Sequence, residues 1–207
     1  MISEVFFPLL SLSRLRMLVD GEGITTLIAG AGCPLSCRFC INKDVLQCLP
    51  ESITPEELYD RVKIDDLYFR ATGGGVTFGG GESLLHSAFI SRFRQICGDG
   101  WKIYAETSLA VPEENLRQAA LCVDGFIVDI KTMDPAIYRS YTGKPGEPAY
   151  ANLRLLQDLV GPERIHIRVP LIPGYNTPED QARSEQILRR QGLSRIECFD
   201  YVLRDYM

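Results

Sequence analysis

The chain has 207 residues, 45% of them hydrophobic, and a formal net charge of −5 at neutral pH, which suits one domain with a sizeable core. The mild acidity and the lack of any Lys or Arg run argue against a nucleic-acid-binding surface. The start, residues 1–8, carries an acid and a short apolar run broken by proline, which predicts neither a signal peptide nor a membrane span.

The predicted elements begin with residues 1–16, which we interpret as a short strand or hairpin at a sheet edge. Glycines make residues 20–23 a turn, and the β-branched run at residues 24–29 predicts the first buried strand. Thr54 and Pro55 have the chemistry of a helix N-cap and first helical position, which predicts a helix ending near Val62.

Beyond residue 62 the sequence alternates between strand and helix patterns. Strands are expected at residues 75–78, 102–105, 125–131, 164–169 and 195–202, and helices at 84–93, from 112 onward, at 135–141, 149–160 and 178–191. With residues 24–29 this gives about six strands in β/α order, so the predicted fold class is α/β with a parallel sheet, an incomplete (β/α)6 barrel. We expect a single domain over 1–207, with 1–19 as an N-terminal edge segment and 20–207 as the partial barrel.

Polar residues gather where these predicted strands end. In parallel barrels the C-terminal ends of the strands form the rim on which active sites are built. The residues concerned are the cysteine loop 33–40, the glycine segment 79–82, Glu106, Asp129, Lys131 and Arg168. The sequence therefore predicts one site supplied by five strands.

The cysteine loop carries Cys33, Cys37 and Cys40, a spacing that does not place three thiols on one face of a helix or strand and so predicts metal ligands. Thiolates suit zinc or iron–sulfur clusters. A [4Fe–4S] cluster held by three thiolates keeps one iron open to a non-protein ligand. The alternatives are a zinc site completed by Cys48 or a distant residue, and a solvent-facing trio without metal; the cluster is favoured over zinc. Seven cysteines without a signal peptide also predict a reducing, cytoplasmic location.

Each of the other candidate residues could have a purely structural role instead of a ligand-binding one. Asp129 and Lys131 could form a surface ion pair, although their spacing in a strand places both on one face. Arg168 could bind a ligand carboxylate or pair with Glu106. Phe39 could belong to the core or stack on an aromatic ligand. His166 is expected to face the helices rather than the site.

Taken together, the motifs resemble those of radical S-adenosylmethionine (SAM) enzymes, and in particular the glycyl-radical-enzyme activating enzymes. The Cys-x3-Cys-x2-Cys spacing with Phe39 before the last cysteine matches the cluster motif. The matching segments are 20–26, 32–37, 74–82, 129–131, 141–143 and 168–174, which span most of the chain.

The resemblance implies a [4Fe–4S] cluster on the three cysteines, with SAM chelating the fourth iron. It places Gly80, Gly81 and Glu82 beside the methionine amino group, and Phe39 beside the adenine. It also implies that Glu106, Asp129, Lys131 and Arg168 line the SAM pocket, and it leaves open a monovalent cation on Glu106 and Asp129.

Some positions depart from the family pattern. Glu106 stands for the usual aspartate, Glu22 and Thr25 for a proline and an arginine, and Ile41 for a frequent histidine. Residues 198–202 do not match the family's histidine-containing C-terminal segment, so that contact is expected to be missing or supplied otherwise. No second cysteine-rich insert lies between Cys40 and Gly79, which predicts a single cluster.

The expected function is reductive cleavage of SAM under anaerobic conditions, most simply to install a glycyl radical on a partner enzyme. The expected partners are a glycyl radical enzyme and a flavodoxin- or ferredoxin-like electron donor, with no membrane and no nucleic acid. Two alternatives stay open: a radical SAM enzyme acting on a small molecule or peptide, and a catalytically silent iron–sulfur or zinc-binding module.

Overall fold

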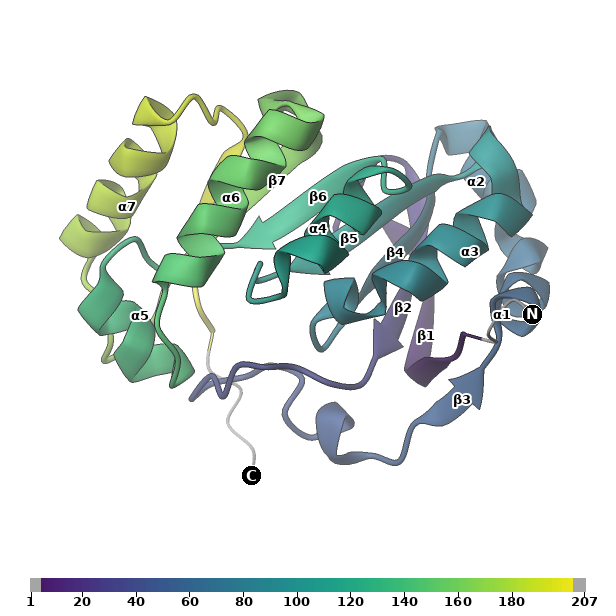
Figure 1. Cartoon of the computed structure of the whole chain (residues 1–207), viewed down its shortest axis with the longest axis horizontal. Helices are drawn as coiled ribbons and strands as arrows, with labels where there is room; N and C mark the ends of the chain where they lie inside the picture. Colours follow the sequence, from purple (N-terminus) through teal and green to yellow (C-terminus); the bar gives the residue numbers. More distant parts are fainter. Residues whose placement is uncertain (1–4, 203–207) are drawn as a thin grey trace.

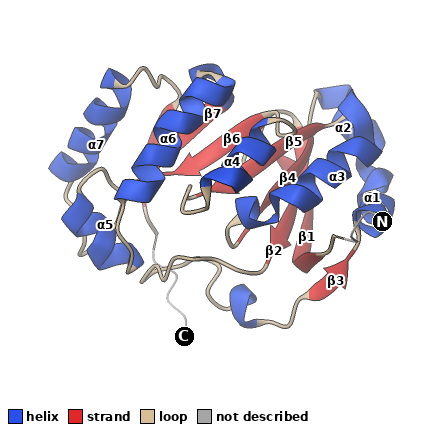
Figure 2. Ribbon diagram, viewed as in Figure 1, coloured by secondary structure: helices blue, strands red, loops and turns tan. Residues whose placement is uncertain are grey.

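A computed structural model of the chain describes residues 5–202 and contains one eight-stranded sheet. The strand order is β3-β1-β2-β4-β5-β6-β7-β8, so the sheet is open, with β3 and β8 at its edges. Pairing is parallel from β2 to β8 in that order, whereas β1 pairs antiparallel with both β2 and β3. Helices pack along one face of this curved sheet (Figures 1 and 2). The α/β partial barrel expected from the sequence is therefore confirmed.

Six parallel strands agree with the prediction, and the elements have the following bounds. The strands are β1 (Phe7–Met17), β2 (Ile24–Gly30), β3 (Glu51–Ile53), β4 (Gly75–Gly80), β5 (Lys102–Thr107), β6 (Gly125–Asp129), β7 (Ile165–Leu171) and β8 (Ile196–Asp200). The helices are α1 (Pro55–Val62), α2 (Asp66–Thr72), α3 (Ser87–Cys97), α4 (Glu113–Ala120), α5 (Pro135–Thr142), α6 (Glu147–Val160) and α7 (Pro178–Arg190).

The differences from the prediction have physical reasons. Strand β3 has only three residues and α2 buries a single side chain, Phe69, so neither shows a hydrophobic period. Strand β6 ends at Asp129 and not at Lys131, because the chain leaves the sheet there. The strand predicted within residues 1–16 is confirmed as β1, but it is not an edge strand, because the short β3 pairs along its outer side. The capped start of α1 is also confirmed, and there the Glu57 N–H donates to Thr54 Oγ1 at 3.2 Å.

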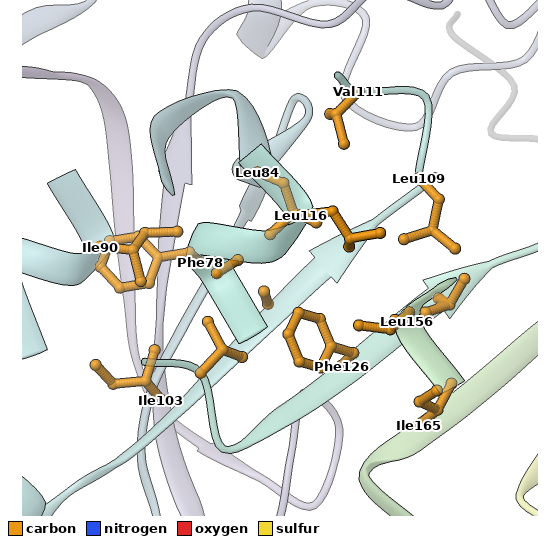
Figure 3. Close-up of a cluster of buried hydrophobic side chains, with 14 of the residues drawn as sticks. Phe78, Leu84, Ile90, Ile103, Leu109, Val111, Leu116, Phe126, Leu156 and Ile165 are labelled. Carbon is orange, nitrogen blue, oxygen red and sulfur yellow. The ribbon is translucent and has the colours of Figure 1, made fainter. Parts of the chain in front are cut away.

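The core lies between the sheet and its helices. Phe78 of β4, Ile103 of β5 and Phe126 of β6 face the helices and are at most 1% exposed. Figure 3 shows them meeting Leu84, Leu116 and Leu156 from the helical layer. Because side chains alternate along a strand, the neighbouring residues Thr77, Tyr104 and Ile127 face the opposite, concave side. Burial of one face therefore fixes which residues point into the barrel.

A buried carboxylate joins β1 to the first parallel strand, β2. Asp65, fully buried between α1 and α2, accepts from Arg14 Nη2 at 2.5 Å and from Arg14 Nε at 2.9 Å. It also accepts from Thr26 Oγ1 at 2.9 Å. The hydrogen bond and charge of Arg14, opposed by burial and assisted by Thr26, lower the pKa of Asp65 below its ordinary value.

We expect Asp65→Asn to lower the free energy of unfolding at pH 7 by about 2 kcal/mol, because one carboxylate oxygen and the charge facing Arg14 are lost. A lowered folded-state pKa contributes stability above the unfolded-state pKa, near 4, and that stability is lost as the pH falls further. The gap between wild type and variant should therefore narrow from pH 7 to pH 3 in urea titrations. A gap that stays constant with pH would contradict this account.

Candidate functional site

The three motif cysteines lie in the loop that follows β2, and all three line one cavity of about 960 Å³ on the concave side of the sheet. Two backbone hydrogen bonds hold the loop against α5. Ser36 N donates to Thr142 O at 2.9 Å, and Arg38 N donates to Tyr141 O at 3.1 Å. Cys33 is exposed, and Cys37 and Cys40 are half-buried. Loop and cavity thus occupy the predicted C-terminal rim.

Burial raises the pKa of Cys33, and it raises that of Cys37 to about 11. Without a bound cation these thiols are protonated at neutral pH, so a metal must displace their protons. Within residues 5–202, no three Cys, His, Asp or Glu side chains are gathered closely enough to hold one metal ion. A zinc site would need that convergence, whereas in a cluster each thiolate binds its own iron. Cys48, the proposed fourth zinc ligand, does not line the cavity. Three thiolates at one cavity are the donor set of a [4Fe–4S] cluster that leaves one iron to another ligand.

The glycine segment after β4 packs directly on the loop. A Cβ on Gly81 would lie 2.1 Å from the carbonyl oxygen of Gly32, and Gly81 N donates to Gly30 O at 2.9 Å. Gly80 has a φ of +91°, and its carbonyl accepts from Asn42 Nδ2 at 2.6 Å. These glycines let two loops approach each other at the rim. Both line the cavity.

Glu82 is 2% exposed, and its carboxylate accepts four hydrogen bonds. The donors are Thr107 Oγ1 at 2.7 Å, Ser108 N at 2.8 Å, Ser108 Oγ at 2.6 Å and Leu84 N at 3.2 Å. Burial raises its pKa, and these hydrogen bonds oppose that shift. The carboxylate therefore ties the end of β4 to the end of β5, and its predicted contact with SAM stays a prediction.

Charged side chains from three neighbouring strands meet on the cavity wall. Arg168 Nη1 of β7 donates to Glu106 Oε1 of β5 at 3.0 Å, and Lys131 Nζ donates to Asp129 Oδ2 at 3.1 Å. Burial, followed by the charge of Asp129, raises the pKa of Glu106 to about 7 despite Arg168. Burial alone would lower the pKa of Lys131, but the charge of Asp129 and the hydrogen bond to it raise that pKa on balance. The wall thus offers both charge signs to a ligand.

Phe39 is the predicted site residue that does not line the cavity. Its ring centroid lies 5.7 Å from that of Tyr175 and 6.4 Å from that of Tyr141. The Tyr201 hydroxyl donates to the carbonyl oxygen of Phe39. The Phe39 side chain thus packs against Tyr141 and Tyr175. Its contact with adenine stays a prediction.

The structure corrects one expectation and adds residues. His166 faces the cavity and not the helices, and its ring lies 3.6 Å from Glu197. Its position two residues before Arg168 was the available signal, since both lie on one face of β7. Asp20, paired with Arg16, also lines the cavity although the sequence offered no chemical role for it. Tyr104, two residues before Glu106, was missed for the same reason as His166.

An open parallel barrel with three loop thiols beside a charged cavity is the arrangement of a radical SAM domain. The sequence profile of the Radical SAM superfamily matches residues 27–182, and the chain belongs to this superfamily. Solved structures share the fold at low identity. Streptococcus suis SuiB superposes with a TM-score of 0.66 at 12% identity, covering 87% of this chain and 40% of SuiB. A radical SAM methyltransferase from Sphaerobacter thermophilus gives a TM-score of 0.56 at 17% identity, covering 94% and 77% of the two chains.

Two curated relatives are activating enzymes by name. The chain is 34% identical over 134 residues to the (2S)-3-sulfopropanediol dehydratase activating enzyme of Klebsiella oxytoca, covering 64% of this chain and 42% of the relative. It is 30% identical over 171 residues to the pyruvate formate-lyase-activating enzyme of Staphylococcus aureus, covering 78% of this chain and 67% of the relative. The chain thus spans less than half of the first relative and about two thirds of the second. No helix in residues 5–202 is both long and apolar enough to cross a membrane.

Proposed function

We propose that this chain is the radical SAM domain of an activating enzyme that cleaves SAM reductively and abstracts hydrogen from a backbone glycine of a partner enzyme. The observation that carries the proposal is the shared cavity, lined by Cys33, Cys37 and Cys40 and by charged groups from β5, β6 and β7. The relatives, which activate glycyl radical enzymes, support the choice of a protein substrate.

In this proposal Cys33, Cys37 and Cys40 would hold a [4Fe–4S] cluster, which would supply the electron needed to split bound SAM into methionine and a 5′-deoxyadenosyl radical. The residues of the chain bind SAM and orient it. Lys131 and Arg168 offer cations to the methionine carboxylate, whereas Glu106 and Asp129 offer anions to its amino group or to a monovalent cation. The glycine Cα–H bond then breaks homolytically, its hydrogen passes to the adenosyl carbon, and the unpaired electron stays on the partner's backbone.

We expect the anaerobically reconstituted protein, given dithionite, SAM and a glycyl radical enzyme, to form methionine and 5′-deoxyadenosine in equal amounts. Electron paramagnetic resonance should show an organic doublet on the partner. The matched control is the same partner with its target glycine replaced by alanine, which should give no doublet. SAM cleavage with no partner radical would favour a small-molecule or peptide substrate. Bound zinc without SAM cleavage would favour the silent module.

A further inference from the structure

The outer side of the cysteine loop carries cations contributed by two segments far apart in the sequence. The backbone bonds from Ser36 and Arg38 to the last turn of α5 hold the loop against that helix. Figure 1 shows α5 beside this loop. A Cβ on Gly143, directly after α5, would lie 3.7 Å from the Ser36 Cβ. Residues of the α5 terminus are therefore neighbours of the loop residues.

Four exposed cations lie on the two joined segments, and we call them the loop cations: Arg38, Lys43, Arg139 and Lys144. Within the part of the chain that the structure describes, none of the four forms an ion pair, although sixteen other pairs are present. The nearest acids in sequence are Asp44, Asp134 and Glu147, and none of them forms an ion pair with a loop cation. A surplus of unpaired positive charge at the loop contrasts with the net charge of −5 for the chain.

None of the loop cations lines the cavity. The three cysteines reach the cavity from one side of the loop, whereas Arg38 and Lys43, within and just after the same loop, point to solvent. Arg38 Nε donates to the Tyr175 hydroxyl at 3.3 Å, which holds the guanidinium beside this tyrosine. The cations therefore do not serve a substrate that enters the cavity.

We propose that the loop cations form the docking surface for the electron donor, a small one-electron carrier protein with an acidic face. This inference rests on the proposed function, because it assigns a surface to the electron that SAM cleavage consumes. Weak redox complexes use small interfaces, for which opposite charges supply orientation and a high association rate. In the docked complex the reduced carrier loses one electron and the cluster gains it, with no bond made or broken.

The test uses the reconstituted protein and a reduced flavodoxin as the probe. We expect the double variant Arg139→Gln/Lys144→Gln to slow cluster reduction by flavodoxin about tenfold at low salt, with the difference shrinking as salt screens the charges. Stopped-flow absorbance at the cluster bands measures the rate. The matched control is Lys63→Gln/Arg92→Gln, which removes one exposed charge after α1 and one partly exposed charge on α3, each ion-paired with a nearby acid, and should leave the rate unchanged.

Dithionite separates this inference from the proposed function, because a small reductant needs no docking surface. Both double variants should be reduced by dithionite, and should cleave SAM with it, at the wild-type rate. Titration of oxidised flavodoxin onto each variant gives a second readout that does not require the cluster. Equal flavodoxin rates and affinities for wild type and the Arg139/Lys144 variant would overturn the inference. Weakened binding of the glycyl radical enzyme with normal flavodoxin reduction would instead assign the surface to the substrate protein.

Discussion

Replacing Cys37 by alanine is expected to abolish SAM cleavage, and this is the largest effect that the site predicts. Cys37 lies between the other two thiols in sequence and lines the cavity with them. Because changes behind a metal ligand already cost 10- to 100-fold in affinity or activity, loss of a ligand should cost more than about 100-fold. Iron and sulfide analysis after anaerobic reconstitution, together with 5′-deoxyadenosine release, measures the loss.

The fold of the variant should survive, because the side chain removed is small and half-buried. Circular dichroism would verify this. Cys48→Ala is the matched control from the same loop region, since Cys48 is exposed and does not line the cavity. We expect it to keep wild-type iron content and activity. Iron loss in Cys48→Ala equal to that in Cys37→Ala would make Cys48 a ligand and would revive the four-thiolate interpretation.

The strands and the rim could be predicted because burial imposes a pattern on the sequence. Phe78 and Phe126 must face the helices, so the alternating neighbours must face the cavity, and charges at the strand ends stand out against apolar runs. The same alternation places His166 on the face of β7 that carries Arg168, so its position in the cavity was also predictable. The short elements β3 and α2 bury too little to leave such a pattern.

What the sequence could not give were contacts made between distant segments. The bonds that hold the cysteine loop come from Tyr141, Thr142 and Tyr201, which are more than one hundred residues away. Arg168 was expected to bind a ligand carboxylate or to pair with Glu106. The structure shows the pair, which reaches from β7 to β5 across β6, and the ligand contact stays a prediction. The sequence also left open whether Gly80 and Gly81 only end a strand or permit a close backbone approach. The structure shows the close approach, because the backbone of Gly30 and Gly32 packs directly on these two glycines.

The hydrogen bonds of Glu82 to residues of the β5 end are another contact between distant segments. Replacement of Glu82 by alanine is expected to lower the free energy of unfolding by about 3 kcal/mol. The change leaves two N–H groups, of Leu84 and Ser108, and two hydroxyl groups without their acceptor, and it frees the end of β4 from the end of β5. Urea unfolding of the protein measures the loss.

Glu82→Gln distinguishes the structural role from the predicted contact with SAM. The amide oxygen can take the place of Oε2 and accept from Ser108, while the amide nitrogen donates to Thr107 Oγ1. Only the 3.2 Å bond from Leu84 N is lost, so the cost should be about 1 kcal/mol. Because the carboxylate already has four protein donors, we expect the Gln variant to bind SAM within about threefold of wild type. A much larger loss of SAM affinity at near-normal stability would show that the negative charge of Glu82, and not its tie between β4 and β5, serves the ligand.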